Sequence, residues 1–189
     1  KAVHDNGAKI GIQLNHGGRK CEAAGMEIEA PSAIPYDENF PMPKAMTKED
    51  IAETVGEFKR AALRAERAGF DLIQIHAAHG YLLNEFLSPL TNRRQDEYGG
   101  SCENRVRFLG EVLDAVRSVW PAEKPIEVRI TAEDYGEGGN RAEDLAVMLN
   151  LVKDKGIDSV NVSTGGLINV VPKAFPGYQV PHAEVIRTM

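Results

Sequence analysis

Two histidines and a tyrosine lie close together in the segment His76-Ala-Ala-His79-Gly-Tyr81, directly after an apolar run. Histidines three residues apart could bind a metal ion, although no inward carboxylate or third histidine is placed to complete a site. They could also cap the following turn. In a third interpretation, two imidazole N–H groups hold a carbonyl oxygen and stabilise the negative charge that it gains during reduction. Tyr81 could then donate a proton to carbon.

Such residues need strands to position them, and four runs rich in Ile or Val have the length and boundaries of strands. The runs are Lys9–Leu14, Asp71–Ala77, Pro125–Thr131 and Ser159–Thr164. Gln13, His76 and Arg129 each lie at or near the end of a different run. In a β/α barrel that end of the strands holds the chemistry.

Helical patterns separate the four runs. The first is expected to begin at Thr47, with acids in its first turn, and to end at Gly69. Ser101 can cap a second helix, and a third is expected from about Ala142 to Lys155, ending at Gly156. Strict alternation predicts a parallel sheet with right-handed crossovers, as in a doubly wound sheet or a barrel. No G-x-G-x-x-G follows a strand, which favours the barrel.

Strand alternation predicts which residues share a face. The inward-facing upper layer would be Gln13, His76 and Arg129. A deeper inward layer would be Gly11, Gln74 and Glu127. The helix-facing residues would be Ile12, Ile75 and Val128. Buried polar groups need hydrogen-bond partners, so a polar ligand above the upper layer is the simplest explanation for its polar side chains. For Arg129, the alternative is a structural ion pair with Glu127.

Composition limits the classes of protein. The chain has 189 residues, 42% hydrophobic residues and a net charge of −6, which is unlike a nucleic-acid-binding protein. No apolar run approaches the roughly 18 residues of a membrane span, and the N-terminus does not resemble a signal peptide. Cys21 and Cys102 do not form a disulfide framework, so we expect a cytoplasmic protein in which both are incidental.

Two further predictions concern residues in loops. Arg19 and Lys20 follow two glycines and are predicted to lie on a solvated loop, and Asp96 and Arg105 are predicted to pair across the long loop after residue 87. The chain opens and stops inside apparent helices, so we expect a piece of a longer protein.

Several stretches together resemble the old yellow enzyme family, in particular its bacterial NADPH dehydrogenase branch. The runs are IQLNHGGRK, IHAAHGYLLNEFLSPLTNRRQDEYGGSCENR, VRITAEDY and FPGYQV. The resemblance covers nearly the whole chain. It implies an α/β fold, a (β/α)8 TIM barrel, of which this chain covers roughly the middle four β/α units. Residues 1–189 would form a partial FMN-binding domain that lacks the first strands and the last, phosphate-binding strands.

The same resemblance implies the activity. A nicotinamide cofactor, NADPH or NADH, would reduce FMN, which then passes hydride to the C=C bond of an α,β-unsaturated carbonyl or nitro compound. Gln13 would hydrogen-bond the polar edge of the flavin ring. Arg129 would lie where the reduced flavin gathers negative charge. Gln74 and Glu127 depart from the branch, for which an acid is expected at the first position and an apolar residue at the second.

For the substrate, the resemblance implies that His76 and His79 hold the carbonyl oxygen and that Tyr81 protonates carbon. Ala77 and Ala78 would line the turn between the histidines. Family members are often homo-oligomers, so we expect one here. Two alternatives remain open: the barrel part of a dienoyl-CoA reductase or amine dehydrogenase with an iron–sulfur cluster, and a fragment without cofactor or catalysis.

Overall fold

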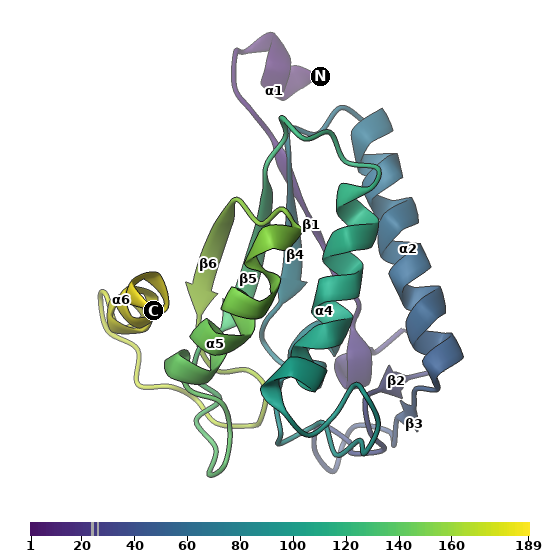
Figure 1. The fold of residues 1–189 in the computed structure, drawn as a ribbon, viewed down its shortest axis with the longest axis vertical. Coiled ribbons are helices and arrows are strands. Elements are labelled where there is room, and N and C mark those ends of the chain that lie inside the picture. Colours follow the sequence, from purple (N-terminus) through teal and green to yellow (C-terminus); the bar gives the residue numbers. More distant parts are fainter. Residues whose placement is uncertain (24, 26) are drawn as a thin grey trace.

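A four-stranded parallel sheet forms the centre of the computed structural model, which describes residues 1–23, 25 and 27–189. The strands are β1 (Gly11–Leu14), β4 (Leu72–Ala77), β5 (Ile126–Thr131) and β6 (Ser159–Ser163). Neighbouring strands pair in the order β1-β4-β5-β6, and all pairs are parallel (Figure 1). The four predicted strand runs and their parallel arrangement are therefore confirmed.

Three long helices cover one face of the sheet (Figure 1). They are α2 (Lys48–Arg67), α4 (Cys102–Arg117) and α5 (Ala142–Val152). Thr47 caps α2 as predicted, because its hydroxyl accepts from the Asp50 N–H while the Asp50 carboxylate accepts from the Thr47 N–H at 2.8 Å. Ser101 caps α4 in a similar way, accepting from the Asn104 N–H.

The hydrophobic core lies between this sheet and these helices. Ile75 and Val128 are completely buried there, and Ile12 packs against the margin of the core. The opposite face of β1, β4 and β5 carries polar side chains. The predicted division of each strand into a helix-facing side and a polar side is confirmed.

Shorter elements complete the described chain. They are α1 (Ala2–Asp5), η1 (Gly18–Lys20), β2 (Glu29–Ala30), β3 (Lys44–Ala45), α3 (Leu82–Leu87), η2 (Lys153–Lys155) and α6 (Val180–Thr188). The helices α2 and α5–η2 end near Gly69 and Gly156, as predicted, and both glycines have left-handed φ angles of 81° and 84°. Among the described residues, no helix is both long enough and apolar enough to cross a membrane.

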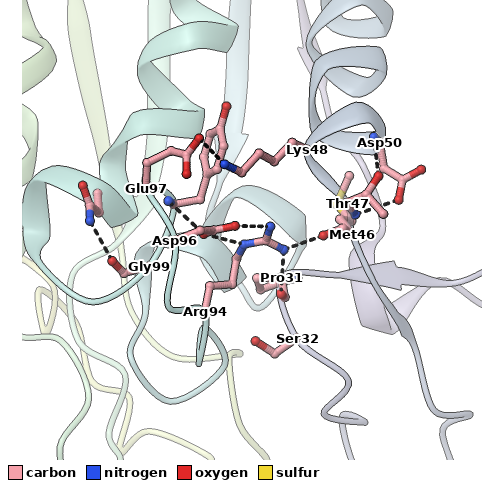
Figure 2. A network of polar contacts seen from close by, with 12 residues as sticks. Pro31, Ser32, Met46, Thr47, Lys48, Asp50, Arg94, Asp96, Glu97 and Gly99 are labelled. Carbon is pink, nitrogen blue, oxygen red and sulfur yellow. Dashed lines mark hydrogen bonds and ion pairs between the residues drawn. The ribbon is translucent and has the colours of Figure 1, made fainter.

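Arg94 holds the long loop that follows α3 (Figure 2). Its guanidinium makes two hydrogen bonds with Asp96, at 3.0 and 2.6 Å, and donates to the carbonyl oxygens of Met46, at 2.5 Å, and Pro31, at 3.2 Å. The predicted pair of Asp96 with Arg105 is wrong. Arg105 instead donates to the Leu87 carbonyl, because its place on α4 directs it toward the end of α3.

Candidate active site

A sharp turn at the carboxyl end of β4 positions the two histidines. His76 is the penultimate residue of β4 and only 3% exposed. His79 has a left-handed φ of 59°, and Thr131 at the end of β5 supports it by accepting from its N–H at 2.8 Å. The next residue, Gly80, also has a positive φ, and a Cβ there would collide with the Gly166 carbonyl. Strand β4 therefore holds the main chain of His76, and the turn after it holds that of His79.

The three predicted catalytic side chains lie together. The ring centroids of His76 and His79 are 5.2 Å apart, and those of His76 and Tyr81 are 5.3 Å apart. Tyr81 is half-buried and occupies the N-cap position of α3, so the helix start fixes its backbone. Ser163, at the end of β6, contacts Nε2 of His79 through its hydroxyl at 2.7 Å.

Both imidazoles are neutral near pH 7. Burial, with smaller contributions from His79 and Arg129, lowers the pKa of His76 to about 4. Burial also lowers the pKa of His79, with smaller contributions from Arg129 and Lys20. A neutral imidazole carries one N–H that can donate to an oxygen. Within the described chain, Nδ1 of His76 is buried without a hydrogen-bond partner.

Arg19 and Lys20 are part of this region, so their assignment to a solvated loop is wrong. Arg19 is 3% exposed and donates to the Leu167 carbonyl at 2.6 Å. The Lys20 ammonium donates to the carbonyl of His79 at 3.0 Å and lies 5.2 Å from the centre of the Tyr81 ring. Sequence reasoning missed both because their carbonyl partners come from distant segments.

The two predicted flavin ligands, Gln13 and Arg129, lie on the polar face of the sheet, but not in one row. Arg129 is in register with His76, whereas Gln13 is in register with Gln74, which is in register with Glu127. The predicted assignment of Gln13 to the row of His76 is wrong, because alternation determines the face of a residue but not the stagger between strands. Among the described residues, Arg129 forms no ion pair with Glu127.

The two alanines of the turn are completely buried. The Ala77 methyl group belongs to the hydrophobic core, so only the main chain of this residue can face a ligand on the polar side of β4. In the part of the chain that the structure describes, no group of three His, Cys, Asp or Glu side chains is placed so that it could hold a metal ion.

The fold and the site define a parallel β/α protein with imidazole donors, a phenol and an arginine at the carboxyl ends of its strands. The chain belongs to the NADH:flavin oxidoreductase / NADH oxidase family, to which residues 1–184 match. It is 58% identical over 185 residues to an NADPH dehydrogenase of Geobacillus thermodenitrificans and 56% identical over 188 residues to one of Clostridium acetobutylicum. These matches cover 98% and 99% of this chain but only 54% and 55% of the relatives.

Solved structures give the same family. Morphinone reductase in complex with tetrahydroNAD matches 99% of this chain and 55% of its own, with a TM-score of 0.78 and 31% identity. The old yellow enzyme homologue from Zymomonas mobilis matches 85% of this chain and 49% of its own, with a TM-score of 0.75 and 34% identity. The predicted family and the (β/α)8 TIM-barrel fold are confirmed. The chain spans about half the length of its curated relatives.

Proposed function

We propose that the protein containing this chain is an FMN-dependent NAD(P)H oxidoreductase that reduces the C=C bond of small α,β-unsaturated carbonyl or nitro compounds. The cluster of His76, His79 and Tyr81 at the carboxyl end of β4 carries the proposal. Family membership and relatives named NADPH dehydrogenase support the flavin and the nicotinamide cofactor.

The polar face of the sheet fits a flavin ring. Arg129 is half-buried on this face, and its Nε is buried without a partner in the described chain, as expected of a cation that a ligand would complete. A cation stabilises the negative charge of a reduced flavin. Gln13, on the same face, offers an amide to the polar edge of the ring. FMN bound there would supply the hydride.

The residues of the turn would act on the substrate. Neutral His76 and His79 can each donate one N–H to a carbonyl or nitro oxygen, and such donors stabilise the charge that the oxygen gains. Their neutrality follows from burial and from the positive charge of Arg129. The phenol of Tyr81, close to the same imidazole, would protonate the carbon beside the activating group.

A two-step spectroscopic experiment on the purified full-length protein tests this function. Under anaerobic conditions, NADPH should bleach a flavin absorption band at about 450 nm, and 2-cyclohexenone or nitrostyrene should restore it. A protein without a flavin band would refute the cofactor assignment. A band that NADPH bleaches but neither acceptor restores would refute the substrate class.

One solved structure favours a second candidate function, the barrel part of a dienoyl-CoA reductase-like enzyme that also carries an iron–sulfur cluster. The 2-naphthoyl-CoA reductase in complex with 2-naphthoyl-CoA matches 99% of this chain with a TM-score of 0.88, but with 26% identity and over only 31% of its own length. The relatives named NADPH dehydrogenase are 54–58% identical, which favours the simpler enzyme. Iron analysis of the full-length protein separates the two, since an iron–sulfur cluster would support only the second.

A further inference from the structure

Four polar side chains form a continuous row across the sheet, one from each strand. Gln13, Gln74, Glu127 and Ser159 are register partners on β1, β4, β5 and β6, whose order is seen in Figure 1. Nε2 of Gln13 donates to Oε1 of Gln74, and Nε2 of Gln74 donates to Oε1 of Glu127. The Ser159 hydroxyl donates to the second carboxylate oxygen at 3.3 Å. Gln74 and Glu127 are thus each other's partners, below the row of His76 and Arg129.

The Glu127 carboxylate determines which atoms donate and which accept in the hydrogen bonds of this row. A side-chain amide can turn over and exchange its oxygen for its NH2 group, but an ionised carboxylate only accepts. Gln74 must therefore turn its NH2 group toward Glu127, which leaves its oxygen for Gln13. Gln13 must in turn direct its NH2 group toward Gln74. Because the two amide atoms diverge from one carbon, Oε1 of Gln13 then points away from the row.

We propose that Glu127 is a positioning residue that fixes, through Gln74, the orientation of the Gln13 amide, so that Gln13 presents an acceptor oxygen to its ligand. This inference rests on the proposed function, in which that ligand is FMN. The oxidised flavin ring carries a single N–H group, at N3, so the oriented Gln13 oxygen would accept from N3–H. A Gln13 amide free to turn would spend part of its time with its NH2 group against this donor.

The test compares two ligands on the full-length protein after removal of its flavin. FMN and 3-methyl-FMN, which lacks the N3–H donor, are titrated by flavin fluorescence, and the measured ratio is the dissociation constant of 3-methyl-FMN divided by that of FMN. Glu127→Leu should weaken FMN binding about fivefold, the effect of one neutral hydrogen bond, and leave 3-methyl-FMN binding unchanged. The ratio should therefore fall about fivefold. A structural defect alone would weaken both ligands alike, and that result would overturn the inference.

Moving the carboxylate provides a rescue. In the double variant Gln74→Glu, Glu127→Leu, an acceptor-only group lies directly beside Gln13, so the ratio should return to that of the unchanged protein. Ser159→Ala is the matched control, because it removes a donor and keeps the carboxylate, and it should leave the ratio unchanged. Glu127→Gln, which keeps the side-chain volume, should lower the ratio if Glu127→Leu does not fold.

The possible failures are distinguishable. If the unchanged protein binds no FMN, both the proposed function and this inference are wrong. If it binds FMN but Glu127→Leu and Glu127→Gln keep the ratio, or the double variant does not restore it, the inference alone is wrong.

Discussion

At the scale of single residues, the ring and the hydroxyl group of Tyr81 have separate proposed roles. Its ring packs 5.3 Å from that of His76, and its phenol is the proposed proton donor. Tyr81→Phe keeps the ring and removes the hydroxyl, so enone reduction should fall on the order of 100-fold. Nitroalkene reduction should fall much less, because the reduced nitronate can leave and collect its proton from water. Stopped-flow rates with both acceptors check this, and equal losses would mean that Tyr81 only positions the substrate.

His76 should remain neutral well below the usual range of a histidine. Its pKa is lowered from 6.5 to about 4, mainly by burial. Between these values the folded protein binds fewer protons than the unfolded chain, so this residue makes stability rise with pH across that window and fall as pH drops toward 4. An NMR titration of the His76 ring should show a midpoint near 4. A midpoint near 6.5 would contradict the buried, neutral state.

The residue scale also shows where sequence reasoning succeeds. His76, His79 and Tyr81 could be predicted to lie together because a single turn after a strand contains all three. Lys20 could not, because its partners are main-chain carbonyls of residues 79 and 166, and a lysine beside glycines has the pattern of a solvated loop. The partners of Gln74 and Glu127 could not be predicted either, since each pairing depends on the register between two strands.

At the scale of elements, periodicity was sufficient for the four strands and the three long helices. It failed for α3, whose six residues are all buried and therefore show no polar face. The two-residue strands β2 and β3 are too short to give a pattern. Strand stagger also escaped prediction, and for that reason Gln13 was placed one row away from its true partners.

Arg94 links the loop after α3 to the ends of β2 and β3, and its removal should destabilise the protein. It is 10% exposed on its side chain, pairs with Asp96 and donates to carbonyls beside β2 and β3 (Figure 2). Arg94→Ala removes the cation that pairs with Asp96 and the donor to these carbonyls, and should destabilise the protein by about 3 kcal/mol. Arg93→Ala, at the exposed neighbouring residue, should change stability by less than about 0.5 kcal/mol. Urea unfolding of both variants measures the difference, and equal stabilities would show that the network adds nothing.

At the scale of the whole molecule, four strands of a barrel leave two strand edges. Within the described residues, β1 and β6 are the edge strands of the main sheet, and the chain covers 54% of its Geobacillus thermodenitrificans relative. Exposed edges favour association with another chain. The 189-residue chain expressed alone should therefore self-associate. It should also lose flavin on gel filtration, because the phosphate-binding strands are expected to lie outside this chain. A yellow, monodisperse monomer with one FMN per chain would contradict this expectation.

The central claim is that the turn after β4 acts on the substrate and not on flavin reduction. The most direct measurement is the rate of each half-reaction in full-length His76→Ala and His79→Ala, with His182→Ala on α6 as control. Loss of one donor costs on the order of 3 kcal/mol, so 2-cyclohexenone should reoxidise the reduced flavin on the order of 100-fold more slowly in the first two variants. NADPH should reduce the flavin at a nearly normal rate, and His182→Ala should behave like the unchanged protein. Unchanged reoxidation in both variants, or equal slowing of the two half-reactions, would contradict the claim.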